Sequence, residues 1–134
     1  MKVQTGVQVL VLSLLAVAPV AQAQGFAEQS LWKNTKGSLL LITKVDEAGK
    51  SFRGTFVNYA KGYSCEGVPI AVSGTFDGDR VSMVGSFAPC AQTMTIWRGT
   101  VSGSTLNISF DLRYVDKEYR FQETKGSDVF TRQN

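Results

Sequence analysis

Asn34 and Ser38 lie four residues apart, on either side of Gly37, where a polar segment changes into the apolar run 39–42. An amide and a hydroxyl at this spacing bring three hydrogen-bonding functions to a single bend. A turn that leads into a strand explains the pattern, because short polar residues and glycine favour turns. A polar ligand held at the end of a barrel explains it equally well. The pair alone leaves both interpretations open.

Further polar and aromatic residues stand near the expected ends of strands. Each has an ordinary explanation, since Trp97 and the phenylalanines suit a core and Asp128, two residues after Gly126, suits a turn. Together, however, amide, hydroxyl and carboxylate groups framed by aromatic rings are what a small, partly polar ligand requires. The candidate set is Asn34, Ser38, Asn58, Phe87, Thr93, Thr95, Trp97, Phe110 and Asp128.

The inventory of reactive groups argues against catalysis. The sequence contains no histidine, which removes the commonest general base, the Ser-His-Asp triad and most zinc sites. No glycine-rich phosphate loop opens a helix. The acidic residues that could act as paired carboxylates fall at expected turns, where solvated roles are usual: Asp46, Glu47, Asp77, Asp79, Asp116 and Glu118. We therefore expect a non-enzymatic protein with no metal and no cofactor.

The charge distribution argues against a nucleic-acid partner. The 14 basic and 11 acidic residues give a net charge of +3 and are scattered along the chain without a basic run. We therefore expect no nucleic-acid partner.

The first 23 residues, MKVQTGVQVLVLSLLAVAPVAQA, have the pattern of a secretory signal peptide. Lys2 precedes an apolar segment at 7–20, and Ala21-Gln22-Ala23 supplies the small residues of a cleavage site. The apolar run is short and contains Gln8 and Pro19, which argues against a retained membrane anchor. We expect cleavage after Ala23 and export of one domain, residues 24–134, to the periplasm or the cell exterior.

Cys65 and Cys90 are the two cysteines of the sequence. In an exported protein an even count predicts one disulfide, and the alternative is two unpaired buried thiols. A disulfide between them would contribute roughly 3–4 kcal/mol through loop closure in the unfolded chain.

From residue 31 onwards, apolar and polar residues alternate with period two, and turn signals such as Asp77-Gly78-Asp79 interrupt the pattern. Short connections require antiparallel neighbours. The expected fold is therefore all-β, an eight-stranded antiparallel up-and-down β-barrel, with a small sandwich as the alternative. Such a barrel has room for side chains or one small ligand. The expected strands are 31–34, 38–45, 51–59, 68–76, 80–87, 93–101, 105–115 and 119–132.

Along almost its whole length, the expected domain resembles the avidin–streptavidin family of biotin-binding barrels. The resemblance is carried by LWKNTKGSLLLI, GTFVNYAKGYSC, TMTIWRGTV and the terminal GSDVFTR, in this order and at these spacings. The cysteine placement is similar to that of short-chain, dimeric bacterial members. It implies a Cys65–Cys90 disulfide that braces the mouth of the pocket.

The resemblance implies that biotin is the partner, with its bicyclic ring deep in the barrel and its carboxylate at the mouth. Asn34 and Ser38 would donate to the ureido oxygen. Asp128 and Asn58 would each accept from one ureido N–H. This set matches the chemistry of the ligand, because a ureido group buried without partners would cost several kcal/mol.

The remaining implied contacts concern the rest of the ligand. Thr95 would face the ring sulfur. Thr93 and the loop Ala60-Lys61-Gly62 would meet the carboxylate. The apolar walls would be formed by Phe87, Trp97 and Phe110, whereas Trp32 would be a structural plug.

Four features depart from the family pattern. Phe56 stands where the family usually has a tyrosine that donates to the ureido oxygen, and Phe87 and Phe110 stand where tryptophan is common. The segment 87–90 is short. Arg120 occupies the position at which tetrameric members insert a tryptophan into a neighbouring pocket, so a homodimer is expected rather than a tetramer.

Two alternatives to biotin binding remain at this stage. An exported inhibitor or interaction barrel could keep the fold without the ligand, although the short loops count against it. A barrel for a more apolar small molecule is favoured by phenylalanine at three polar or indole positions.

Overall fold

The computed structural model describes residues 26–88 and 90–134. The expected signal peptide, residues 1–23, lies outside the described residues, so its cleavage remains a prediction. Within the described part of the chain, no helix is long and apolar enough to cross a membrane.

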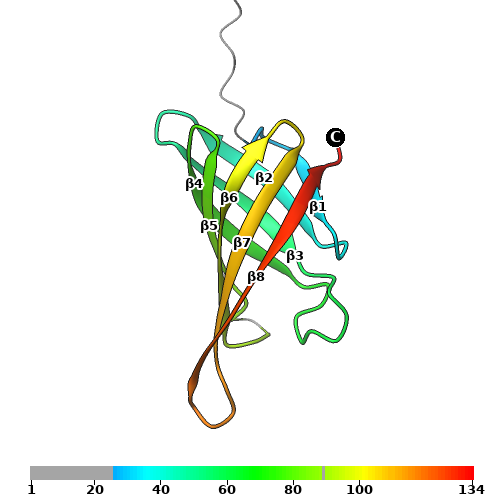
Figure 1. Cartoon of the computed structure of the whole chain (residues 1–134), viewed down its shortest axis with the longest axis vertical. Helices are drawn as coiled ribbons and strands as arrows, with labels where there is room; N and C mark the ends of the chain where they lie inside the picture. Colours follow the sequence, from blue (N-terminus) through cyan, green and yellow to red (C-terminus); the bar gives the residue numbers. More distant parts are fainter. Residues whose placement is uncertain (1–25, 89) are drawn as a thin grey trace, which may run out of the picture.

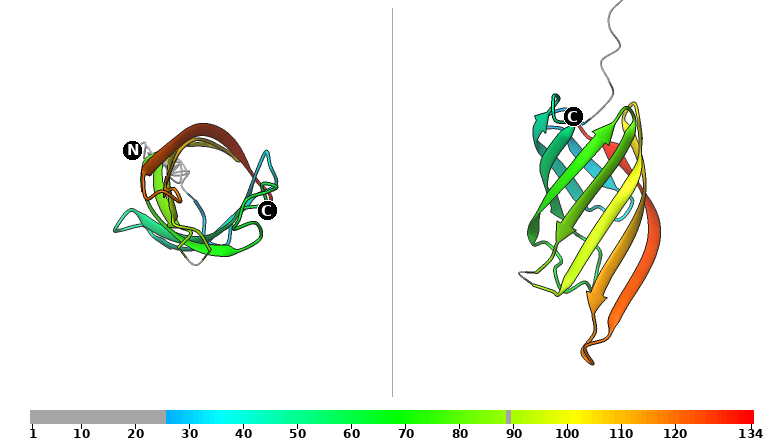
Figure 2. Two further views of the ribbon diagram at one scale, coloured as in Figure 1. Left: turned by 90° about the horizontal axis from the view of Figure 1, so that it is seen from below. Right: turned by 90° about the vertical axis from the view of Figure 1, so that its left-hand side faces the viewer.

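Eight strands form a closed barrel in which each strand pairs antiparallel with the next one along the chain. Pairing of β1 with β8, through Trp32 opposite Arg132, closes the ring. Figure 1 shows the strands from the side, and the left view of Figure 2 looks along the barrel and shows the closed ring. The expected eight-stranded up-and-down barrel is confirmed. The strands are β1 (Leu31–Asn34), β2 (Leu39–Asp46), β3 (Ser51–Val57), β4 (Pro69–Asp77), β5 (Arg80–Ser86), β6 (Thr93–Ser102), β7 (Thr105–Val115) and β8 (Phe121–Arg132).

β5 is one residue shorter than expected, and two other strands are each two residues shorter because side chains bind the backbone at their ends. β3 stops at Val57, and the Asn58 amide oxygen accepts a hydrogen bond from the Ala60 backbone N–H at 2.8 Å. β8 begins at Phe121 instead of Tyr119, because Tyr119 adopts a positive φ of 61° in the preceding turn. Asx-type turns of this kind compete with strand pairing for backbone groups.

The barrel interior is filled at the end from which the described chain enters. The Phe26 ring lies 5.2 Å from Trp32 and 4.9 Å from Phe52, measured between ring centroids. The Trp32 indole N–H donates to Ser30 Oγ at 3.0 Å, and both residues are fully buried. Trp32 therefore plugs the barrel interior, as the resemblance implied.

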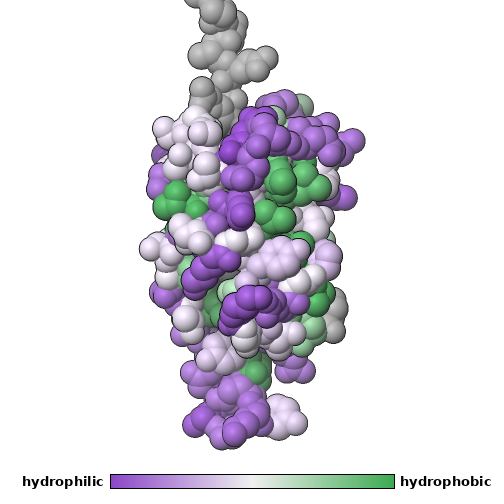
Figure 3. Space-filling model, turned by 90° about the vertical axis from the view of Figure 1, so that its right-hand side faces the viewer, coloured by the Kyte–Doolittle hydropathy of each residue, from purple (hydrophilic) through white to green (hydrophobic). Residues whose placement is uncertain are grey.

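The hairpin of β7 and β8 extends beyond the other strands (Figures 1 and 2). Its turn is held by the Asp116 carboxylate, which accepts from the backbone N–H groups of Glu118 and Arg120 at 2.9 Å each. The protruding tip presents mainly hydrophilic residues on the face shown in Figure 3.

The predicted disulfide is confirmed. Cys65 and Cys90 are bonded, with their Cα atoms 5.6 Å apart, so the alternative of two unpaired thiols is wrong. The bond joins the loop between β3 and β4 to the short connection between β5 and β6.

Candidate functional site

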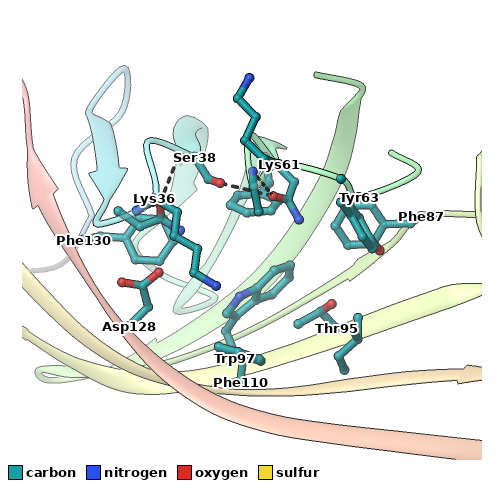
Figure 4. Close-up of a pocket in the computed structure, with 16 residues that line it drawn as sticks. Lys36, Ser38, Lys61, Tyr63, Phe87, Thr95, Trp97, Phe110, Asp128 and Phe130 are labelled. Carbon is teal, nitrogen blue, oxygen red and sulfur yellow. Dashed lines mark hydrogen bonds between the residues drawn. The ribbon is translucent and has the colours of Figure 1, made fainter. Parts of the chain in front are cut away.

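A cavity of about 350 Å³ lies at the opposite end of the barrel from Trp32, and Figure 4 shows the residues around it. This volume is at the small end of the range for small-molecule pockets. Polar and aromatic side chains from most of the strands and from three connections converge on it. The lining residues are Asn34, Lys36, Ser38, Phe56, Asn58, Ala60, Lys61, Gly62, Tyr63, Phe87, Thr95, Trp97, Phe110, Leu112, Asp128 and Phe130.

The turn between β1 and β2 presents Asn34 to the cavity in a defined orientation. Its side-chain oxygen accepts from the backbone N–H of Lys36 at 3.1 Å and of Ser38 at 2.8 Å. Gly37 adopts a φ of +86°, which a residue with a Cβ rarely does. Because the oxygen is occupied by the turn, the amide NH₂ of Asn34 is left as the donor. The two interpretations of this motif are therefore compatible, since the turn itself orients the donor.

Ser38, which precedes β2, and Asn58, which follows β3, are hydrogen-bonded to each other. The Ser38 hydroxyl accepts from the Tyr59 backbone N–H at 3.0 Å and donates to the Asn58 side-chain oxygen at 3.4 Å. The same Asn58 oxygen accepts from the Ala60 N–H. The Ser38–Asn58 contact is long for an O–H···O bond, so the hydroxyl proton can be redirected at little cost. Redirection would also free one lone pair on Asn58.

Asp128 has one occupied and one available carboxylate oxygen. Its Oδ1 accepts from the Thr35 hydroxyl at 2.7 Å and from the Val129 backbone N–H at 2.7 Å. Within the described part of the chain, Oδ2 has no hydrogen-bond partner, and the carboxylate points into the cavity in Figure 4. The site therefore combines an oriented acceptor on β8 with the donors Asn34, at the end of β1, and Ser38, in the turn that precedes β2.

Aromatic rings form the apolar wall of the cavity. The Phe56 ring lies 5.2 Å from Trp97, 6.3 Å from Phe87 and 6.4 Å from Phe130, with edge-to-face or tilted geometry. Phe56 therefore faces the cavity, at the position where the resemblance implies a tyrosine. These ring contacts hold the rings in place. Because residue 56 is a phenylalanine, this part of the wall carries no hydroxyl.

Phe110 can lie flat over β8 because its cross-strand neighbour is glycine. Phe110 pairs with Gly126, and a Cβ added to Gly126 would lie 2.4 Å from the Phe110 ring. Any side chain at Gly126 would thus push the ring into the cavity.

The loop between β3 and β4 covers one side of the mouth. The Tyr63 hydroxyl is hydrogen-bonded to the Thr93 hydroxyl at 3.0 Å, and the Tyr63 ring lies 5.6 Å from Phe87. The Cys65–Cys90 bond lies just beyond these contacts. The loop is therefore attached to the barrel by a ring contact, a hydrogen bond and a covalent bond.

Lys61, in the same loop, forms an ion pair with Glu66 at 2.9 Å. The hydrogen bond from the Lys61 ammonium group lowers the pKa of the Glu66 carboxyl below its ordinary value. The charge of Lys61 is thereby balanced within the loop.

Every residue predicted to bind the ligand lines the cavity, except Thr93, whose hydroxyl is instead bonded to Tyr63. Lys36, Tyr63, Leu112 and Phe130 were missed. Signals for three of them were present: Lys36 lies between Asn34 and Ser38, and Leu112 and Phe130 follow Phe110 and Asp128 at the two-residue period of a strand.

A closed barrel with an internal cavity, lined by oriented polar groups and rings, defines a small-ligand-binding β-barrel protein. The chain belongs to the avidin family, whose model, described as "Avidin family", matches residues 22–133. It is similar to Afifavidin from Afifella pfennigii, at 33% identity over 125 residues, which cover 86% of this chain and 77% of that protein.

Solved structures of the family share the fold. The bradavidin2–biotin complex superposes with a TM-score of 0.74 at 36% identity, covering 81% of this chain and 99% of that one. The apo form of intact afifavidin superposes with a TM-score of 0.72 at 28% identity, covering 85% of this chain and 88% of that one.

Proposed function

We propose that this chain binds biotin in the barrel cavity and holds it without chemical change. The proposal is carried by one observation: donors on Asn34 and Ser38 and acceptors on Asn58 and Asp128 converge in a cavity walled by rings. A ureido group needs one oxygen and two N–H groups to be satisfied when it is buried. Membership of the avidin family and the likeness to a biotin complex support the same ligand.

Binding would proceed by exchange of hydrogen bonds inside the cavity. The Ser38 hydroxyl turns from Asn58 to the ureido oxygen, joining the Asn34 amide NH₂. This frees the Asn58 oxygen to accept from one ureido N–H, and Asp128 Oδ2 accepts from the other. Because the exchanged Ser38–Asn58 contact is long at 3.4 Å, little free energy is lost in breaking it.

Thr95 faces the ring sulfur in this arrangement, and Trp97, Phe87 and Phe110 enclose the apolar ring. Ala60 and Lys61 lie at the mouth with the ligand tail. The chain needs no cofactor for this function, because biotin is the ligand and no bond is made or broken. The absence of histidine from the sequence supports a non-enzymatic role.

Isothermal titration of the purified protein with biotin tests the function. We expect saturable binding at one site per chain and an increase in thermal stability, since a ligand that binds only the folded state stabilises it. Absence of both heat and a thermal shift would refute biotin binding. Binding of a neutral apolar compound instead would favour the alternative of an apolar ligand.

We also propose that the protein is exported and forms a homodimer. The signal-peptide pattern of residues 1–23 supports export to the periplasm or the cell exterior. Val84 and Met94, 40% and 43% exposed, and the half-buried Ile96 form an apolar patch on the outer face of β5 and β6, where Val84 pairs with Ile96. Such a patch is suited to a second copy of the chain. N-terminal sequencing of the exported protein tests the cleavage after Ala23.

A further inference from the structure

Lys36 is held at the rim of the cavity by a rigid turn. Its backbone N–H donates to the Asn34 side-chain oxygen at 3.1 Å, and the neighbouring Thr35 hydroxyl donates to Asp128 at 2.7 Å. Gly37, which follows, completes the turn with its N–H bonded to the Asn34 carbonyl at 3.1 Å. The start of the Lys36 side chain is therefore fixed, and Figure 4 shows this side chain reaching over the cavity.

Two lysines line the cavity, and their charges are balanced differently. The Lys61 ammonium group is paired with Glu66 at 2.9 Å, and its side chain points away from the cavity in Figure 4. The ion pairs found within residues 26–88 and 90–134 do not include Lys36. Its ammonium group is thus a cation at the mouth without an ion-pair partner among the described residues.

An ammonium group is a donor with a full positive charge, so its best partner is a carboxylate. The ureido head already has two donors and two acceptors among Asn34, Ser38, Asn58 and Asp128. The ligand group that still lacks a charged partner is the carboxylate of the tail. The Lys36 side chain, which starts beside Asn34, reaches over the cavity and can meet that carboxylate (Figure 4).

We infer that Lys36 is a specificity-determining residue, which pairs with the tail carboxylate and makes the site prefer free biotin to biotin with a neutral tail. The inference rests on the proposed function and concerns a residue that the sequence motifs did not identify. It distinguishes between ligands that share the same bicyclic head.

The experiment titrates biotin and biotinamide, which has the same head and an uncharged tail, into the unaltered protein and into Lys36→Met. Methionine keeps most of the length of the side chain and removes its charge. Lys33→Met is the matched control, because Lys33 is an exposed lysine on β1 that does not line the cavity. Titrations at low and high ionic strength measure the electrostatic part, which salt screens.

We expect Lys36→Met to weaken biotin binding by roughly 3- to 10-fold, as for a charge-assisted hydrogen bond at a partly solvated rim. Biotinamide binding should be unchanged. The preference for biotin over biotinamide should therefore largely disappear, and so should the salt dependence of that preference. Lys33→Met should keep the preference.

Each other outcome overturns the inference in a recognisable way. Equal weakening of both ligands would place Lys36 against the shared head and not the tail. Unchanged affinity for both would mean that Lys36 makes no contact, while biotin binding itself would stand. Failure of the unaltered protein to bind either ligand would overturn the proposed function and the inference together.

Discussion

Phe56 is the single residue that most clearly separates this cavity from the family pattern. Its side chain is buried, with an exposed fraction of 5%. Its ring packs edge-on against Trp97, on the wall nearest Ser38 and Asn58. A bare ring stands where a hydroxyl would add a third donor to the ureido oxygen. The polar set on Asn34 and Ser38 therefore has to polarise this oxygen without help.

Phe56→Tyr should tighten biotin binding by roughly 3- to 30-fold, because a hydrogen bond to a polarised oxygen contributes about 0.5–1.5 kcal/mol or somewhat more. The gain should appear mainly as slower dissociation, measured by competition kinetics. A correctly folded variant with unchanged or weaker affinity would show that Phe56 does not face the ureido oxygen of the bound ligand.

The polar residues of the cavity give a second prediction that concerns single side chains. Asn34→Ala or Asp128→Ala should each weaken biotin binding by roughly 1–3 kcal/mol, the usual cost of leaving a buried polar group without its partner. Calorimetry measures the loss. Asn107→Ala, an exposed asparagine on the outer face of β7, is the matched control and should bind like the unaltered protein. Equal affinities for all variants would contradict the site.

Among the structural elements, the loop between β3 and β4 decides how firmly the mouth is formed. It carries Ala60, Lys61 and Tyr63 and is covalently attached through Cys65 to Cys90. A bridge that closes a loop over a sequence separation of 25 stabilises the fold chiefly by restricting the unfolded chain.

Replacing both cysteines by serine should lower the free energy of unfolding by roughly 3–4 kcal/mol. It should also speed biotin dissociation, since the loop then depends on the Tyr63–Thr93 hydrogen bond and ring contacts alone. Denaturant unfolding and dissociation kinetics measure the two effects. Loss of stability without faster dissociation would show that the bridge does not brace the mouth.

The β7–β8 hairpin depends on the ionised Asp116 carboxylate. The Arg120 backbone N–H, and in addition Gln122, Glu118 and the Arg120 guanidinium, lower its pKa below the ordinary value of 3.8, although burial acts in the opposite direction. A carboxyl with a lowered folded-state pKa stabilises the fold above its ordinary pKa, and this contribution is lost as the pH falls below about 3.8.

Asp116→Asn should therefore reduce hydrogen-exchange protection in the hairpin turn at neutral pH. The difference in protection between the variant and the unaltered protein should become smaller as the pH falls below 3.8. Exchange of the Glu118 and Arg120 amides measures this. A difference that stays constant with pH would mean that the charge of Asp116 does not stabilise the turn.

At the scale of the whole molecule, assembly depends on which outer face is apolar. Arg120 is exposed at the hairpin tip and forms ion pairs with Asp116 and Glu118 of its own chain. A guanidinium held in this way is a poor cover for an apolar pocket on another subunit. The patch of Val84, Met94 and Ile96 is the better surface for self-association.

Light scattering at micromolar concentration should give the mass of a dimer. Met94→Lys should shift it toward the monomer, because a buried unpaired charge disfavours the contact. Tyr119→Ser, at a 90% exposed position on the hairpin tip, is the control and should remain a dimer. A compact tetramer for the unaltered protein would contradict both the role of Arg120 and the choice of surface.

The sequence by itself determined the strand number, the strand order and most of the strand bounds to within one residue. It could do so because alternation of apolar and polar residues and the chemistry of tight turns are local properties. It also indicated the disulfide, since only two cysteines were available. Of the twelve residues predicted to bind the ligand, eleven line the cavity.

Only the tertiary structure decided which groups meet inside the barrel and which of their atoms are already engaged. The Tyr63 hydroxyl is hydrogen-bonded to the Thr93 hydroxyl, and the Ser38 hydroxyl donates to the Asn58 side-chain oxygen. The Lys36 side chain reaches over the cavity. These contacts depend on strand register, strand tilt and barrel closure, which bring together residues that are far apart in the chain. Local patterns carry no information on such distances, so the hydrogen bonds of the site had to come from the fold.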